Sequence, residues 1–132
     1  MFAMGTPDVA AEAAAMQGRG VDVGEPALGT RDAQGNAPAY TWEAAPVASD
    51  ATPGSETFLI QHHMAMSERY TQPPDASRHA NGATGVAGLA LAVPDVSVAA
   101  AAWERVLGRR PEPVQERASE AGHRARFALG GL

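Results

Sequence analysis

The sequence contains no cysteine, which excludes disulfide frameworks, thiolate zinc sites and cysteine nucleophiles. All ten basic residues are arginine, and the net charge of −5 gives no electrostatic support for nucleic-acid binding. The longest apolar run, VAGLALAV from Val86, is too short to span a bilayer, and the first residues lack the features of a signal peptide. We therefore expect a cytoplasmic protein with no membrane span and no nucleic-acid partner.

Two stretches far apart in the chain share one pattern. They are TPDVAAEAAAM from Thr6 and VPDVSVAAAAW from Val93. In each, the proline favours an extended residue before it, and the aspartate can cap a helix. Apolar residues then recur at helical spacing until a glycine. The pattern predicts helices near residues 9–17 and 96–107, each preceded by a strand, the second strand being VAGLALAV (86–93).

Three extended segments are expected after the first helix: VDVGEP, APAYTWEAA and ETFLIQHHM. The stretch GTRDAQGNAP, between the first two of these, has the glycine, aspartate and asparagine content of a turn. Residues 1–70 thus predict a β-α-β-β-β unit. Residues 71–84 are polar and rich in proline and glycine, and we interpret them as a linker. Residues 85–132 predict a second, β-α-β-β unit, which is one strand short of the first.

Two such units with matching Pro-Asp corners resemble the vicinal oxygen chelate superfamily, and more closely its glyoxalase-like domain proteins. The resemblance runs over nearly the whole chain, through Pro7-Asp8, Gly20 to Pro26, Gly29-Thr30-Arg31, Gly35, Trp42, Phe58 to His62, and His79 to Gly82. It implies a single α+β domain, 1–132, built of paired βαβββ modules. A cupped, mixed or antiparallel sheet would carry the helices on its outer face and a small-molecule site in the cup.

The resemblance also bears on metal binding. Metal-dependent members carry a histidine in the strand before each corner and a glutamate in the fourth strand. The corresponding positions are Met1 and Gly88 for the histidines and Leu59 for the glutamate, and none of the three suits a divalent ion. We therefore expect no metal and no cofactor, which favours a small-molecule binder. A lyase or isomerase acting on a small oxygenated metabolite stays open as the alternative, as does a truncated, inactive module.

The candidate substrate-binding residues are Arg31, Trp42, Gln61, His63 and His79. Because Leu59 corresponds to a cup-facing position, strand alternation places Gln61 and His63 on the cup side as well, and His62 against a helix or at the strand end. An imidazole in the cup could move a proton or bind a metal. Alternatively, it is a strand-end histidine that hydrogen-bonds only water or backbone. A non-standard metal site would use His62, His63 or His79.

The other candidates also have two interpretations. Arg31 could clamp a carboxylate or phosphate, or it could be a turn residue paired with Asp32. Trp42 shares a strand face with Tyr40 and could line a ligand pocket, although aromatic residues on a sheet are more often core. Trp103, at helical spacing, is expected in the core.

The missing last strand of the second unit predicts an unpaired sheet edge, and such edges attract another chain. The end of the sequence, RFALGGL from Arg126, offers little charge to prevent this pairing. Family resemblance points the same way, since related modules pair between chains. We expect a homodimer in which a partner copy completes or contacts the second unit. The alternative is a monomer whose linker covers the edge.

Overall fold

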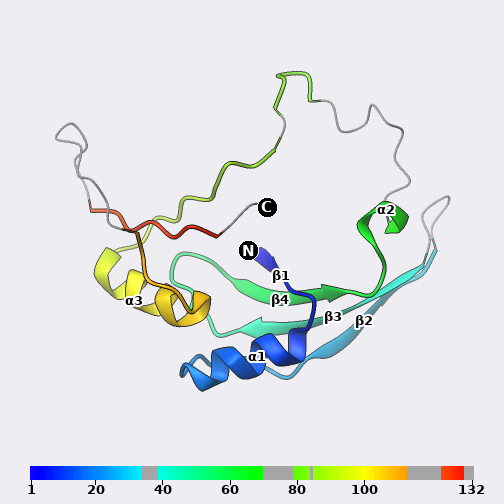
Figure 1. Ribbon diagram of the computed structural model, residues 1–132, viewed down its shortest axis with the longest axis horizontal. Helices are drawn as coiled ribbons and strands as arrows, with labels where there is room; N and C mark the ends of the chain where they lie inside the picture. Colours follow the sequence, from blue (N-terminus) through cyan, green and yellow to red (C-terminus); the bar gives the residue numbers. More distant parts are fainter. Residues whose placement is uncertain (34–38, 70–78, 84, 113–122, 130–132) are drawn as a thin grey trace.

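The computed structural model describes residues 1–33, 39–69, 79–83, 85–112 and 123–129 (Figure 1). Its elements, in chain order, are β1 (Phe2–Gly5), α1 (Val9–Gly18), β2 (Ala27–Arg31), β3 (Tyr40–Val47), β4 (Thr57–His62), α2 (Met66–Arg69) and α3 (Val96–Leu107). The predicted β-α-β-β-β unit is therefore present. None of the helices in these ranges is long and apolar enough to cross a membrane.

The four strands form one mixed sheet in the order β1-β4-β3-β2. β1 runs parallel to β4, and the other neighbours are antiparallel. α1 and α3 lie against one face of this sheet, which we call the helix face (Figure 1). The sheet is neither closed nor strongly curled, so the predicted cup is corrected to an open sheet.

Both Pro-Asp corners act as predicted from their residue types. Asp8 Oδ1 accepts a hydrogen bond from the backbone N–H of Ala11 at 2.8 Å, and Asp95 Oδ1 accepts one from that of Ser97 at 2.8 Å. These bonds satisfy amide groups that the first turn of a helix leaves unpaired. α3 ends at Gly108, whose φ of 63° is the left-handed conformation that glycine adopts readily. The two predicted helices are confirmed to within one residue at each end.

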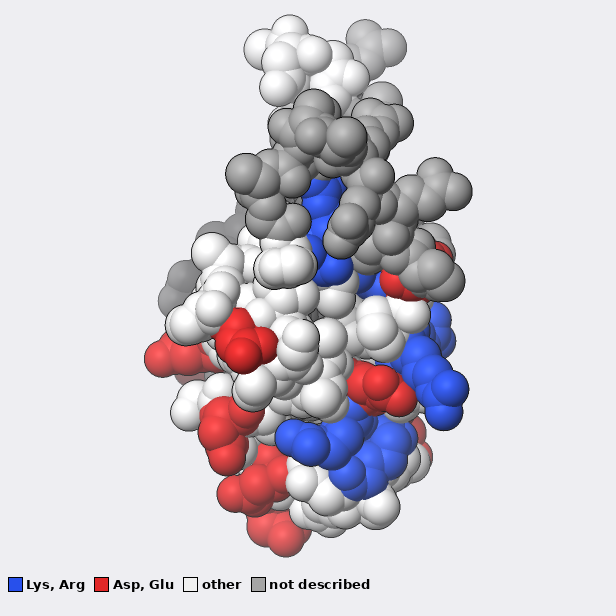
Figure 2. Space-filling model, turned by 90° about the vertical axis from the view of Figure 1, so that its left-hand side faces the viewer, with Lys and Arg blue, Asp and Glu red and all other residues white. Residues whose placement is uncertain are grey.

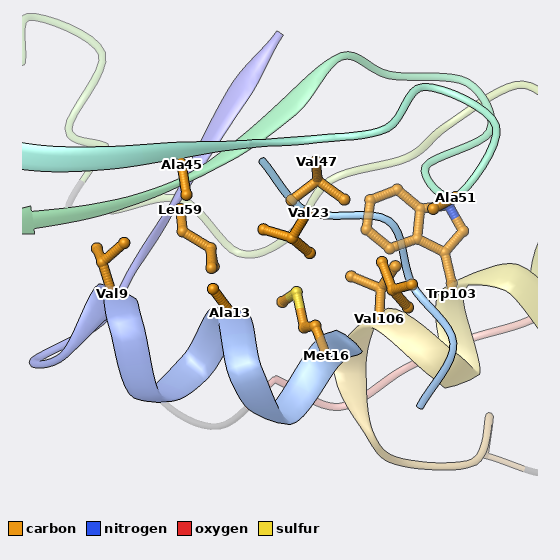
Figure 3. Packing of buried hydrophobic residues seen from close by; sticks show 11 residues of the cluster. Val9, Ala13, Met16, Val23, Ala45, Val47, Ala51, Leu59, Trp103 and Val106 are labelled. Carbon is orange, nitrogen blue, oxygen red and sulfur yellow. The ribbon is translucent and has the colours of Figure 1, made fainter. Parts of the chain in front are cut away.

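The hydrophobic core fills the space between the helix face of the sheet and the two longer helices (Figure 3). Its buried members are Val9, Ala13, Met16, Val21, Val23, Ala45, Val47, Ala51, Leu59, Trp103 and Val106. Trp103 is in the core as predicted: its ring stacks on that of Phe2 with centroids 5.7 Å apart, and its indole N–H donates to the carbonyl of Pro53 at 3.1 Å. This contact fixes α3 against the edge strand β1.

Arginines gather at the end of the molecule formed by α3, where they appear in blue among acidic groups (Figure 2). Arg19, which follows α1, donates through Nε to the carbonyl of Arg105 at 2.6 Å and through Nη2 to that of Val106 at 2.9 Å. Arg110 pairs with Glu104 at 3.6 Å. Much of the positive charge at this end is thus engaged by acceptors of the protein itself.

The predicted strand at 86–93 is not present. These residues are irregular, and Val86 and Leu89 are exposed by 68% and 66%. Apolar composition alone does not make a strand, because a strand also needs a neighbour to receive its backbone hydrogen bonds. No such bond joins 86–93 to another described segment.

The last two strands of the predicted second unit were expected near Val114 and at HRARFALGG (123–131). The first lies outside the described residues, and the described part of the second, 123–129, contributes one isolated bridge, Glu112–Arg126.

The second strand lies later in the chain than predicted. VDVGEP supplies one isolated bridge, Val23 to Val47, and β2 is formed by ALGTR instead. Gly29, which the sequence suggested as part of a turn, therefore stands inside a strand. The reason is packing: a Cβ atom at Gly29 would lie 2.5 Å from Nε1 of Trp42. The glycine leaves room for the indole of the neighbouring strand.

Candidate functional site

The faces of β4 are the reverse of those predicted. Leu59 is 1% exposed and points toward α1 with the core residues (Figure 3). Alternation then places Gln61 and His63 on the helix face, and His62 on the other face of the sheet. The sequence identified correctly which residues share a face. The assignment of Leu59 to a cup-facing position was wrong, because Leu59 fills the core beneath α1.

The face of the sheet turned away from α1 carries a group of four side chains that we call the aromatic platform. It consists of Arg31, Tyr40, Trp42 and His62. Cross-strand register brings them together, since Arg31 pairs with Tyr40 and Trp42 with His62. The Tyr40 ring lies 5.6 Å from that of Trp42 and 6.1 Å from that of His62, between centroids. The Arg31 guanidinium carbon lies 5.6 Å from the Tyr40 centroid, within reach of a cation–π interaction.

His62 is the titratable group of this platform with a perturbed environment. Burial lowers the pKa of its imidazole, and the positive charge of Arg69 and the neighbouring His63 lower it further. Its Nδ1 is buried and has no hydrogen-bond partner among the described residues. His62 is therefore neutral near pH 7 and contributes no second positive charge beside Arg31.

A shallow hollow of about 390 Å³ adjoins the platform where β2 ends, β3 begins and β4 ends. It is lined by Thr30, Arg31, Asp32, Ala39, Tyr40, Thr41, His63 and Met64. Arg31 and Tyr40 thus belong to both the hollow and the platform. Two predicted site residues, Arg31 and His63, come from segments more than thirty positions apart and meet at this hollow.

His63 is held at the hollow by a backbone hydrogen bond from its N–H to the carbonyl of Thr41, at 3.1 Å. Its Nε2 lies 3.9 Å from Oε2 of Glu43, and both side chains are partly exposed. An imidazole beside a carboxylate is an arrangement that can accept and return a proton, provided a substrate reaches it. At 3.9 Å the two atoms are too far apart for a direct hydrogen bond.

The other predicted site residues lie differently. Trp42 is on the platform, beside the hollow. Gln61 uses its side-chain oxygen to accept the backbone N–H of Val9 at 3.1 Å, so it helps to position the start of α1. His79 is exposed in a short turn closed by the bond from Gly82 N–H to its carbonyl at 2.9 Å, and it does not line the hollow. A ligand role for Gln61 or His79 stays a prediction.

A family model described as a glyoxalase-like domain matches residues 1–107, from the first strand to the last residue of α3. The chain belongs to the glyoxalase-like domain family. This confirms the resemblance drawn from the ordered motifs. No curated protein and no solved structure matches the chain significantly. The family match thus identifies the domain, while the substrate has to be inferred from the site itself.

A metal site in this glyoxalase-like domain would need several ligating side chains close together. Within the described ranges, no three His, Asp or Glu side chains gather closely enough to hold an ion. Leu59, which the resemblance placed at the family's glutamate position, faces the core beneath α1, so that correspondence does not hold, and Gly88 has no side chain to offer. Neither residue can supply a ligand to a divalent ion.

Sequence reasoning missed the importance of His62 and the hollow-lining threonines, Thr30 and Thr41. The threonines face each other across β2 and β3, a pairing that depends on register. Because GTRDAQGNAP was assigned to a turn, the pairing of its first residues with β3 could not be predicted. With β2 placed at ALGTR, the match of Arg31 to Tyr40 and of Thr30 to Thr41 would have followed from strand pairing alone.

Proposed function

We propose that this glyoxalase-like domain binds a small oxygenated molecule at the hollow beside the aromatic platform, without using the family's usual metal ligands. The observation that carries the proposal is the convergence of Arg31 and His63 on one hollow from two separate strand ends. The volume of about 390 Å³ falls in the range of small-molecule sites. Thr30 and Thr41 add hydroxyl groups, and Tyr40 adds an aromatic surface.

Arg31 is assigned the anchoring role. No ion pair of its guanidinium with Asp32 or any other described carboxylate is found, so the alternative of a turn residue paired with Asp32 loses its support. A guanidinium free of carboxylate partners can hold a carboxylate or phosphate by two parallel hydrogen bonds. His63 and the two threonines line the same hollow from the helix face of the sheet, at the strand ends.

A screen of small organic acids, aldehydes and alcohols by thermal shift, followed by native mass spectrometry, tests this proposal. Compounds that stabilise the wild-type protein should lose most of their effect with Arg31→Gln and part of it with His63→Gln. Arg110→Gln is the matched control, because it removes the same charge from a side chain that is 91% exposed and belongs to α3's end of the molecule. The proposal fails if no compound binds, or if binding is the same in all three variants.

A second candidate function, a lyase or isomerase of the glyoxalase type, is favoured by one observation, the 3.9 Å approach of His63 Nε2 to Glu43 Oε2. Such a pair could remove and return a proton next to a carbonyl group. Proton exchange of α-hydroxy and α-oxo compounds in D₂O, followed by NMR, tests it. Exchange should stop in Glu43→Gln and His63→Gln and persist in Arg110→Gln. Metal analysis of the purified protein belongs to the same experiment: a bound ion whose loss follows His63→Gln would favour the enzyme.

A further inference from the structure

The four platform side chains select a narrower class of ligand than the hollow alone. We propose that the ligand is an aromatic monocarboxylate, whose ring stacks on Trp42 beside Tyr40 and whose carboxylate pairs with Arg31. This inference rests on the proposed function, because it concerns the same site. The observation behind it is the geometry of the platform. The Arg31 guanidinium carbon lies 5.6 Å from the Tyr40 ring, and that ring lies 5.6 Å from the Trp42 ring, so one small ligand could contact all three side chains.

The aromatic surface of the platform is set in place before any ligand arrives. The Trp42 indole lies against the backbone of Gly29, so closely that a Cβ there could not fit. The Tyr40 ring is tilted 48° to the indole at 5.6 Å. Rigid aromatic side chains lose little conformational freedom on binding, so a ring that stacks on them gains contact at low entropic cost. Because of this tilt the Trp42 indole is the plane available for stacking, and a saturated ring of the same size lacks the flat face that stacks on it.

The charge of the platform favours a single negative group. Arg31 is the one permanent cation among its four side chains, and its guanidinium already lies over the Tyr40 ring. A carboxylate bound to Arg31 would therefore be next to the stacking surface. The charge of Arg69 acts on His62 from outside this group. Asp32 lines the same hollow, and its carboxylate repels a dianion more strongly than a monoanion. This disfavours a phosphate monoester relative to a carboxylate. His62, as a neutral imidazole, does not offset the Asp32 charge.

The test uses 2-naphthoate as the probe, with two analogues that each change one property. 2-Naphthamide keeps the rings and removes the charge, and the fully saturated decalin carboxylate keeps the charge and removes the aromatic face. Ligand-observed NMR gives dissociation constants for the wild-type protein. 2-Naphthoate should bind about tenfold or more tightly than either analogue, as expected for loss of a charge-assisted bidentate contact or of stacking.

Variants then assign the two preferences to residues. Arg31→Gln should abolish the advantage of naphthoate over naphthamide, while Trp42→Leu should abolish its advantage over the saturated acid. Arg110→Gln should change neither. Phenyl phosphate, as a dianion, should bind more weakly than naphthoate.

The outcomes separate this inference from the proposed function. If naphthoate fails to bind, or binds no better than both analogues, while screened compounds still bind in an Arg31-dependent way, the ligand class is wrong and the binding function stands. If phenyl phosphate binds more tightly than naphthoate, the class is again overturned. If no compound of either set binds, both proposals fail. The comparison of ligands on the wild-type protein remains decisive even where a variant fails to fold.

Discussion

The indole of Trp42 on β3 lies directly against Gly29 of β2, in the space that any other side chain at position 29 would occupy. This contact explains why a glycine stands in a strand, where it has no turn to make. It also fixes the position of the Trp42 indole, which is one of the two aromatic rings of the platform. The pair therefore links a local feature of the sequence to the shape of the candidate site.

Gly29→Ala should displace the Trp42 indole. The added Cβ would lie 2.5 Å from Nε1, so the ring has to move or the strands have to separate. Such overpacking costs about 1–3 kcal/mol. Urea unfolding should show this loss, and the fluorescence of the native state should change as the indole moves. The control is Gly18→Ala at the end of α1, where a Cβ would meet nothing within 4 Å and the free energy of unfolding should stay the same or rise. Equal stability of the two variants would contradict the packing role of Gly29.

Arg19→Gln should destabilise the packing of α3 on α1. The Arg19 guanidinium caps the carbonyls of Arg105 and Val106, and its removal leaves both without this donor. Hydrogen bonds from a charged donor contribute about 1.5–3 kcal/mol. Arg110→Gln, which removes an exposed surface ion pair, should change the free energy of unfolding by less than about 0.5 kcal/mol. Similar losses for the two variants would show that Arg19 acts only through its surface charge.

Stability should fall as the pH is lowered from about 7 toward 5, and part of this fall should come from His62. Burial lowers the pKa of His62 in the folded protein below its ordinary value of about 6.5. The unfolded chain therefore binds the proton first, and protonation favours unfolding. This contribution is complete above about pH 6.5 and is lost as the pH falls toward the folded pKa. His62→Gln should flatten the dependence, whereas Arg110→Gln, at an exposed position, should leave it as in the wild type. Parallel profiles for wild type and His62→Gln would contradict the assignment.

Those features of the fold that depend on neighbours in the sequence could be predicted. Asp8 and Asp95 cap their helices because a cap needs only a carboxylate one turn from free amides. The face of Leu59 could not be predicted in this way. Alternation determines which side chains of a strand lie together, and it leaves open which of the two faces a helix will cover. The family resemblance was used to choose the face of Leu59, and it gave the wrong face.

The candidate site could be predicted only in part, because the sequence shows which residues have suitable chemistry but not which strands pair. Arg31 and His63 were identified by their chemistry, and their meeting at one hollow depends on a cross-strand register that the misplaced β2 concealed. The strand expected from Val86 onward failed because strand formation needs a partner edge as well as apolar residues. The sequence shows the apolar residues, but it does not show whether a partner edge is present.

We propose that the expected homodimer forms through the edge strand β1. This surface differs from the end of the chain, which the sequence suggested. Phe2 N–H donates to the carbonyl of Glu56 and Thr6 N–H to that of Ile60, each at 3.0 Å. By alternation, the N–H groups of Ala3 and Gly5 point away from β4, and no described strand pairs with that edge. Such an edge can pair with a second copy.

Light scattering at increasing concentration tests this dimer, and Ala3→Pro should weaken it by removing an outward N–H. Ala10→Pro, in the first turn of α1 where proline is tolerated, is the control. Deleting the chain from Phe127 onward is a poorer test, because Phe127 packs against the core. A mass near 13.6 kDa at every concentration, as expected for one chain, would exclude the dimer.

The most direct test of the proposed binding site is a titration of ¹⁵N-labelled protein with the compound that stabilises it most in the thermal-shift screen, followed by amide chemical shifts. The account predicts that the largest shift changes fall on Thr30, Arg31, Tyr40, Thr41 and His63, around the hollow, and that Arg31→Gln reduces them all. Changes centred on α3, or no changes at a concentration that stabilises the protein, would contradict it.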